Sequence, residues 1–403
     1  MAVGLNPEPA MRPVPGVRLG TASAGIKKPG HRDLVVMELA PGTRATAVFT
    51  RNRFCAAPVH VAREHLAATE PRYLLINTGN ANAGTGERGF RDARACCDAV
   101  ARHADTSPQA VVPFSTGVIG EPLPAERIAS AIPAALDALA ADGWAAAAPA
   151  ILTTDTVPKG ASRTVRLDAG EVVLTGMAKG AGMIRPDMAT MLAFIATDAQ
   201  ITQSQLDAML PEAVRSSFNR ITIDGDTSTN DACLLAATGA SGVAVVTEAD
   251  AQRFLEALRG LCEELAQAIV RDGEGATRFI TIAVQGGRSE AEAVAVAFTV
   301  AQSPLVKTAF FAGDPNWGRI LAAIGRAGID DMDVDRVAIW LDDLCIAANG
   351  GRAEDYREEQ AAERMARDEV TVAVDLGRGA ASARVWTCDF SYEYVRINAE
   401  YRT

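Results

Sequence analysis

The feature that most constrains this chain is a glycine-rich stretch near its middle, residues 175–198, which reads TGMAKGAGMIRPDMATMLAFIATD. Glycines in the first part of the stretch flank a single lysine, Lys179, and they allow positive φ angles and close approach of the backbone. Pro186 favours extended geometry for the residue before it, and an apolar run follows at 191–196. The stretch therefore predicts a loop that leads into a strand, with Thr190 at the junction.

A hydroxyl at that junction has a route to becoming a nucleophile. A threonine hydroxyl reacts poorly until a base takes its proton. Cleavage of the bond between Ala189 and Thr190 would give Thr190 a free α-amine with an unperturbed pKa of about 8, which can accept that proton. The small Ala189 leaves room for attack on its carbonyl group. The local sequence alone still favours the simpler interpretation, in which Thr190 begins an ordinary buried strand.

Further motifs occur in a fixed order along most of the chain. Besides KGAGMIRPDMATML around Thr190, the blocks are STGVIGE at 115–121, TTDTVPK at 153–159, SFNRITIDGDTSTND at 217–231, DPNWGR at 314–319 and INAEYRT at 397–403. This ordered set resembles the glutamate N-acetyltransferase (ornithine acetyltransferase) family of arginine biosynthesis. The resemblance implies an α/β (α+β) chain with the self-processing fold of the DmpA and ornithine acetyltransferase type, in which helices flank layered sheets.

The resemblance also implies a reaction and the residues that perform it. Thr190 would attack the acetyl group of N-acetylornithine, release ornithine and pass the acetyl group to glutamate, a double displacement through an acetyl-threonine ester. Each tetrahedral intermediate carries an oxyanion, which the Thr116 hydroxyl and the Gly117 N–H would stabilise. The catalytic residues expected from the family pattern are therefore Thr190, Thr116 and Gly117, with self-cleavage between Ala189 and Thr190.

The substrate-binding positions implied by the resemblance are chemically suited to amino acids. They are Thr156, Lys179, Thr190, Glu274, Asn398 and Thr403. Lys179 can pair with a substrate carboxylate, and Glu274 can pair with a charged amine. Thr403 is the last residue of the sequence, so its terminal carboxylate is a further candidate contact.

Self-cleavage would divide the chain into an N-terminal (alpha) chain, 1–189, and a C-terminal (beta) chain, 190–403. Neither part has an obvious complete domain pattern, so we expect the two to interlock as one body through buried apolar surface. The family implies a heterotetramer of such chains. No cofactor is expected, and the sequence leaves open whether acetyl-CoA also serves as an acetyl donor.

Composition excludes several other classes of protein. The net charge of −11 disfavours nucleic acid as a partner. The seven cysteines show no C-x-x-C motif and no Cys/His cluster, which predicts reduced thiols, a cytoplasmic location and no zinc site. Segment 129–148 is interrupted by charges and a proline, so no membrane span is expected. Segment 221–231 holds three acids and suggests magnesium or calcium, but its spacing fits no EF-hand; we expect a hydrogen-bonded loop near the site and no metal.

Patterning gives further expectations for local structure. Residues 1–32 are rich in proline and glycine and predict a surface arm. A helical region at 125–148 should be kinked or split at Pro133. A long amphipathic helix is expected at 248–270, and a helix at 289–302. All four histidines lie within the first 103 residues, which argues against a Ser-His-Asp type of triad at Thr190 unless the fold brings one of them near.

Two other functions remain open at this stage. One is a self-processing hydrolase, an aminopeptidase or amidase, in which water resolves the acyl-enzyme. It would release acetate without any dependence on an acceptor. The other is a non-catalytic amino-acid-binding protein, in which Thr190 is structural. It would bind ligand tightly and turn nothing over.

Overall fold

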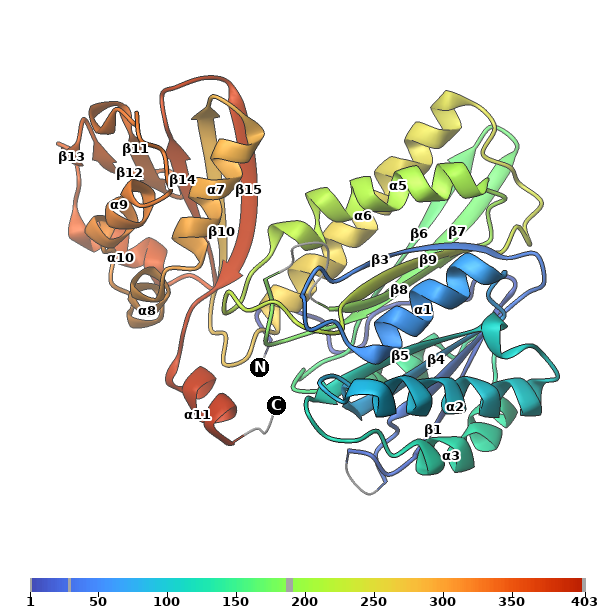
Figure 1. Ribbon diagram of the computed structural model, residues 1–403. Helices are drawn as coiled ribbons and strands as arrows, with labels where there is room; N and C mark the ends of the chain where they lie inside the picture. The colour runs from blue at the N-terminus through green and yellow to red at the C-terminus, as the bar shows by residue number, and fades with distance from the viewer. Residues whose placement is uncertain (1, 28–29, 186–190, 401–403) are drawn as a thin grey trace.

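Three β-sheets and the helices that cover them organise the described part of the chain, as the computed structural model shows (Figure 1). The structure describes residues 2–27, 30–185 and 191–400. Two sheets stack face to face between helices, and the third belongs to a body built from the C-terminal part of the chain. The expected α/β (α+β) class, with layered sheets flanked by helices, is confirmed.

The first sheet has the strand order β1-β2-β4-β5, and its β4–β5 pair is parallel. Its members are β1 (Val17–Ala22), β2 (Leu34–Leu39), β4 (Tyr73–Asn80) and β5 (Val111–Val118). One face packs against α2 (Gly86–Ala104) and α3 (Ala125–Asp137). The other face meets the second sheet, and α1 (Ala57–Ala68) and α4 (Trp144–Ala150) add buried side chains to the core between the two sheets.

The second sheet has the order β3-β9-β8-β7-β6, and its β8–β9 pair is parallel. Its members are β3 (Arg44–Phe49), β6 (Lys159–Leu167), β7 (Gly170–Lys179), β8 (Leu192–Thr197) and β9 (Ala232–Ala237). In β8, Phe194 faces the first sheet while Ala193 and Ile195 face the covering helices. Successive side chains of a strand point to opposite faces, so a strand buried on both sides is apolar throughout. The strand predicted after Thr190 is confirmed.

Two helices cover the outer face of the second sheet, α5 (Gln203–Ser216) and α6 (Glu248–Arg271). The apolar stripe of α6 is fully buried, as its spacing of three and four residues predicts. The Thr247 hydroxyl accepts the Asp250 N–H and caps the first turn of α6. The long helix predicted at 248–270 is therefore confirmed.

Strands from both sides of position 190 share the second sheet. β3, β6 and β7 come before that position in the sequence, and β8 and β9 come after it. β8 is hydrogen-bonded to β7 on one side and to β9 on the other. The division into 1–189 and 190–403 stays a prediction, but the two parts are joined by a continuous sheet.

The C-terminal body contains the third sheet, in the order β13-β12-β11-β14-β10-β15. Its strands are β10 (Phe279–Gly287), β11 (Ala338–Leu341), β12 (Leu344–Ala348), β13 (Gly351–Arg352), β14 (Glu369–Asp375) and β15 (Ala381–Cys388). Its helices are α7 (Glu290–Ala301), α8 (Pro304–Ala312), α9 (Trp317–Gly325) and α10 (Glu358–Met365). The last helix, α11 (Tyr392–Glu400), leaves this body and lies apart from it (Figure 1), and its Asn398 contacts Glu274.

Short 3-10 turns lie between these elements. They are η1 (Pro108–Ala110), η2 (Phe218–Arg220) and η3 (Val334–Arg336). Among the described residues, no single helix combines the length and hydrophobicity needed to cross a membrane. The pair α7 and α8, bent by 56°, could do so by length and composition alone. Their apolar side chains contribute to the core of the C-terminal body.

The prediction of a surface arm at 1–32 is wrong in part. Residues Val17–Ala22 form β1, which pairs with β2 along its whole length and is mostly buried. Val17 and Leu19 of this strand reach the core between the sheets. Their alternation is typical of a strand, but the surrounding prolines and glycines obscured that pattern in the sequence. The region at 125–148 does divide into two helices, but Pro133 stays inside α3 and the break comes after Asp137. The helix predicted at 289–302 is confirmed as α7.

Candidate active site

A cavity of about 230 Å³ opens where four strands of the stacked sheets come together. β5 and β7 end at this cavity, and β8 and β9 begin there. Five predicted site residues from well-separated parts of the sequence line it, namely Thr116, Gly117, Lys179, Glu274 and Asn398. No histidine is among the described residues that line it.

Thr116 and Gly117 lie near the end of β5, on the wall of the cavity. Gly117 has a φ of +132°, and a Cβ atom there would come within 2.3 Å of the Gly79 carbonyl carbon in the neighbouring strand β4. Only glycine fits this conformation and this approach. The local geometry therefore fixes a Thr-Gly pair beside the cavity, as an oxyanion site requires.

Lys179 ends β7, lines the cavity and is 8% exposed as a whole residue. It donates hydrogen bonds to the hydroxyls of Thr116, at 3.2 Å, and Thr153, at 2.8 Å. Burial lowers the pKa of Lys179, and the carboxylates of Asp155, Asp231 and Glu274 act in the opposite direction. A lysine ammonium has three donors, so one remains for an anionic group in the cavity.

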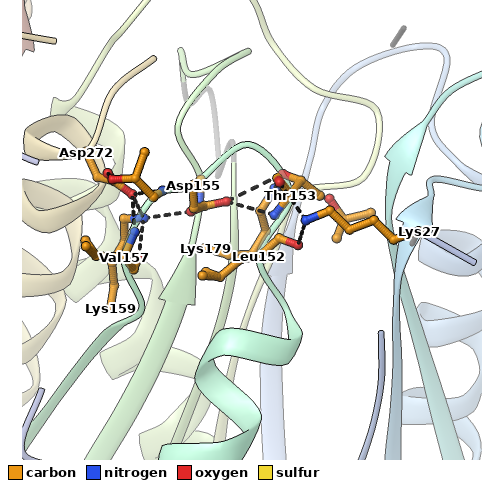
Figure 2. A network of polar contacts seen from close by, with 11 residues as sticks. Lys27, Leu152, Thr153, Asp155, Val157, Lys159, Lys179 and Asp272 are labelled. Atoms are coloured by element: carbon orange, nitrogen blue, oxygen red, sulfur yellow. Dashed lines mark hydrogen bonds and ion pairs between the residues drawn. The ribbon is translucent and has the colours of Figure 1, made fainter. Parts of the chain in front are cut away.

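A buried ionic network stands behind Lys179 (Figure 2). Asp155 accepts the Lys159 ammonium at 2.7 Å, the Gly180 N–H at 2.6 Å and the Thr153 N–H at 3.0 Å. Lys159 also contacts Asp272 at 2.7 Å, and the side chains of all three charged residues are at most 1% exposed. Burial alone would raise the pKa of Asp155, but the ammonium groups of Lys159 and Lys179 outweigh it and hold that pKa below its ordinary value. The network fixes the loop that positions Thr153.

The structure places Thr156 in this network and not among the residues that line the cavity. Its hydroxyl and its N–H both donate to the Asp272 carboxylate. Asp272 ends the long helix α6 as its C-cap. The predicted substrate-binding role of Thr156 stays a prediction; in this structure Thr156 acts on the loop behind Lys179.

Glu274 and Asn398 both line the cavity and contact each other. The side-chain amide of Asn398 in α11 donates to the Glu274 carboxylate at 2.7 Å. The main-chain N–H of Glu274 donates to the Ala181 carbonyl at 2.8 Å, which holds Glu274 against the glycine-rich loop. A Cβ atom on Gly182 would lie 2.5 Å from the Glu274 carboxylate. This glycine therefore leaves the space in which the carboxylate reaches the cavity.

The acidic loop at 221–231 cradles the chain just before the predicted cleavage site. Asp224 accepts the N–H groups of Met183 at 2.6 Å and Ile184 at 2.9 Å, and the Thr227 hydroxyl donates to the Arg185 carbonyl at 3.0 Å. Burial raises the pKa of Asp224, opposed by these N–H donors. The prediction of a hydrogen-bonded loop near the site is confirmed. Within the described ranges, no group of three or more His, Cys, Asp or Glu side chains could hold a metal ion.

Three predicted residues lie outside the described residues: Ala189, Thr190 and Thr403. Sequence reasoning also missed three buried groups of the site, Lys159, Asp272 and Asp231. Lys159 and Asp231 lie within the quoted motifs, but nothing in a motif shows that a side chain will be buried beside the cavity. Asp272 lies outside those motifs and only the fold brings it to Lys159.

Groups of both charges line the cavity. Lys179 lies beside the Thr-Gly pair, and the carboxylates of Asp224, Asp226 and Glu274 line the wall with Asn398. A ligand with one carboxylate and at least one amine complements this arrangement. A nucleophile just before β8 would act beside the Thr-Gly pair and the charged groups of this cavity.

Comparison with known proteins gives one family match and curated relatives that cover nearly the whole chain. Residues 18–403 match the model of the ArgJ family. The chain is 56% identical over 407 residues to "Arginine biosynthesis bifunctional protein ArgJ" of Pseudomonas syringae pv. tomato, covering 100% of both chains. It is 58% identical to the protein of the same name from Methylococcus capsulatus, covering 97% of this chain and 96% of the other. A solved ornithine acetyltransferase from Mycobacterium tuberculosis, in complex with ornithine, is 34% identical, with 46% of this chain and 98% of that chain covered and a TM-score of 0.40.

Proposed function

The chain belongs to the ArgJ family, and we propose that it transfers the acetyl group of N2-acetyl-L-ornithine to L-glutamate, giving L-ornithine and N-acetyl-L-glutamate. One observation carries the proposal. Five residues that the family pattern assigns to catalysis or substrate binding, from separate parts of the sequence, line a single cavity with complementary charges. This is an acyltransferase reaction on small molecules.

The proposed nucleophile is Thr190, freed by self-cleavage after Ala189. Its hydroxyl attacks the acetyl carbonyl while its own α-amine takes the proton, and the same proton then passes to the departing amine of ornithine. Thr116 and Gly117 support this step because they lie side by side on the cavity wall, where an oxyanion would need two donors. Glutamate then enters, its amine attacks the acetyl-threonine ester, and Thr190 is regenerated.

Lys179 and Glu274 are the proposed anchors for the substrates. The spare donor of the Lys179 ammonium suits the α-carboxylate that both substrates carry. Glu274 suits the side-chain ammonium of ornithine, and Asn398, bonded to Glu274, supplies an amide to the same wall. Thr156 and the C-terminal Thr403 complete the proposed set of substrate-binding residues.

The acetyl group is carried on the protein itself, so the proposal includes no cofactor. The name of the relatives contains "bifunctional", and we extend the proposal to acetyl-CoA as a second acetyl donor for glutamate. The mature protein would contain chains 1–189 and 190–403 in a heterotetramer in the cytoplasm. Support for the interlocking comes from the second sheet, where strands from both sides of position 190 pair.

Intact-mass analysis of the purified protein and its Thr190→Ala variant tests the proposal. Wild-type protein should yield two chains with a new N-terminus at residue 190. Incubation with N-acetylornithine should add one acetyl group to the second chain, and glutamate should remove that group as N-acetylglutamate. Thr190→Ala should stay one unacetylated chain. A wild-type chain that stays intact and inactive would contradict the proposal, and acetate release independent of glutamate would identify a hydrolase instead.

A further inference from the structure

One aromatic side chain of the cavity wall has no part in the reaction described so far. Tyr394 belongs to α11, is half-buried, and lines the cavity together with Glu274 and Asn398. Its hydroxyl makes no hydrogen bond to any described residue. The hydroxyl of a buried tyrosine usually finds a partner. A hydroxyl without one at the wall of a cavity is therefore a candidate contact for a ligand.

The main chain of Tyr394 is held firmly beside Glu274. The Ser391 hydroxyl, just before α11, donates to the Gly275 carbonyl at 2.6 Å. Gly275 has a φ of +70°, and a Cβ atom there would lie 2.5 Å from the Tyr394 nitrogen, so only glycine allows this approach. The Asn398 amide donates to the Tyr394 carbonyl at 2.9 Å and to the Glu274 carboxylate at 2.7 Å. Tyr394 and Glu274 therefore keep a fixed relation to each other.

The ring of Tyr394 is also fixed, by a stack of side chains from the C-terminal body. It stacks on Phe390, with ring centroids 4.5 Å apart and planes inclined by 18°. The buried Lys307 ammonium lies 4.4 Å from the centroid of the Phe390 ring and donates to the Thr387 hydroxyl at 2.9 Å. Stacking occupies one face of the Tyr394 ring, so Tyr394 can meet a ligand through its other face, its edge and its hydroxyl.

The surroundings of the Tyr394 hydroxyl are acidic. Burial raises the pKa of Tyr394, and the carboxylates of Asp224, Glu274 and Asp226 act in the same direction. These three carboxylates line the same cavity as Tyr394. The hydroxyl therefore stays neutral, and it can both donate and accept a hydrogen bond.

The proposed reaction makes opposite demands on one cavity. The acetyl group is on the α-nitrogen in both N-acetylornithine and N-acetylglutamate, so the side chains of ornithine and glutamate occupy the same place in turn. One side chain ends in an ammonium group and the other in a carboxylate. Glu274 suits the ammonium, but a carboxylate only accepts hydrogen bonds and repels another carboxylate. A neutral hydroxyl can meet either side chain without any change of its own charge.

Other polar groups near Glu274 are already engaged. Both N–H groups of the Asn398 amide are used, one by Glu274 and the other by the Tyr394 carbonyl. The Thr229 hydroxyl, which also lines the cavity, donates to the Asn230 side chain at 2.6 Å. Tyr394 thus has the donor that remains for a second substrate beside Glu274.

We propose that Tyr394 lets one cavity take both substrates in turn: its hydroxyl accepts a hydrogen bond from the side-chain ammonium of ornithine and donates one to the side-chain carboxylate of glutamate. Glu274 pairs with the ammonium in the first half of the reaction, and Tyr394 supplies the donor for the carboxylate in the second half. This inference rests on the proposed function. It adds a specificity-determining residue to the proposed set of substrate contacts.

Tyr394→Phe tests the inference, because phenylalanine keeps the ring and its stack on Phe390 but lacks the hydroxyl. In a double displacement, kcat/KM for each substrate reports its own half-reaction. On cleaved protein, we expect kcat/KM for glutamate to fall about 10–100-fold, because a hydrogen bond to a charged group is lost. That for N-acetylornithine should fall less than about 3-fold, because Glu274 still pairs with the ammonium. Tyr392, on the same helix, is 83% exposed, and Tyr392→Phe is the matched control that should change neither value.

The difference between the two substrates separates substrate contact from a structural role. A structural role would lower both kcat/KM values alike, so an equal loss, a larger loss for N-acetylornithine, or no loss for glutamate overturns the inference. An active wild type with any of these results leaves the proposed function standing, whereas a wild type that transfers no acetyl group contradicts the proposed function itself.

A second variant decides the question if Tyr394→Phe fails to fold or to cleave itself. Phe390 is not among the described residues that line the cavity. Phe390→Leu removes the stack that fixes the Tyr394 ring but keeps the hydroxyl. It should lower kcat/KM for glutamate more than that for N-acetylornithine, and equal effects on the two substrates would overturn the inference.

Discussion

Replacing Lys159 with methionine should destabilise the protein strongly, although Lys159 does not line the cavity. The Lys159 side chain is completely buried between Asp155 and Asp272, with both contacts at 2.7 Å. Methionine retains most of the volume and removes the charge, so two buried carboxylates lose their shared cation. The change therefore isolates the ionic contribution of the network in Figure 2.

Removing one partner from a buried ion pair costs about 3–5 kcal/mol. Asp155 keeps the electrostatic support of Lys179, and Asp272 keeps two N–H donors and the Thr156 hydroxyl. These contacts argue for the middle of the range, so we expect a loss of about 4 kcal/mol at pH 7. The pH dependence of the stability contribution follows from the direction of the Asp155 pKa shift. The folded-state pKa of Asp155 is lowered, so its contribution is present above the unfolded value of about 3.9 and is lost as the pH falls through the folded value.

The assay is urea unfolding followed by circular dichroism, carried out in a Thr190→Ala background so that each sample is one uncleaved chain. The exposed pair Arg166–Glu171, at 83% and 57% side-chain exposure, provides the matched control. Arg166→Met should cost less than about 1 kcal/mol. Without Lys159 the Asp155 carboxylate loses a cation that lowers its pKa, so the stability deficit of the variant should shrink as the pH is lowered toward 4.

Two results would refute this reasoning. One is a Lys159→Met variant whose stability at pH 7 differs from the parent by no more than the Arg166→Met control does. The other is a deficit that grows as the pH is lowered, because protonated carboxyl groups should tolerate the loss of the cation better than charged ones.

Three further predictions concern catalysis. Thr116→Val should lower kcat for acetyl transfer by a factor of about 10²–10³ with little change in KM, because the proposed site loses one oxyanion donor. Steady-state kinetics test this, and a lowered KM with an unchanged kcat would contradict it. Gly182→Ala should displace the Glu274 carboxylate, 2.5 Å from the new methyl group, and raise KM for N-acetylornithine by about 10-fold or more, measured on cleaved protein. The lowered pKa of Lys179 means that its ammonium is lost as the pH rises. KM for glutamate should therefore increase on the alkaline side, and Asp155→Asn, which removes a carboxylate that raises this pKa, should move the increase to lower pH.

Elements with a strong local pattern could be predicted from the sequence. The apolar spacing of α6 and the apolar run of β8 determine those elements within their own segments. β9 gave no such signal, because its sequence ACLLAA lacks β-branched and aromatic residues. It is a strand because β3 and β8 pair with it on both sides, and such pairing between distant segments is not written in the strand itself.

The site residues also divide into those that the sequence could predict and those that it could not. Lys179 and Glu274 could be proposed from the family resemblance, since each has glycines nearby in the sequence and carries a charge that suits an amino acid. The burial of Lys159 beside Asp272 could not, because it depends on the end of α6 meeting the start of β6. The burial of Asp231, whose Oδ2 atom has no hydrogen-bond partner among the described residues, likewise depends on how deeply the start of β9 is covered. Motif reasoning found several residues that line the cavity, but it could not show which further side chains the fold would bury at the cavity or behind it.

The second sheet contains strands from both sides of position 190, and this bears on how the gene encodes the protein as well as on how the protein assembles. If the chain is cut before β8, each product carries strands whose hydrogen-bonding edges were built to be filled by the other product. Either product made alone would present open, apolar strand edges, which promote aggregation. Encoding both as one chain guarantees equal amounts and assembly before separation. We therefore expect that two separately expressed halves, mixed after synthesis, will not restore the enzyme.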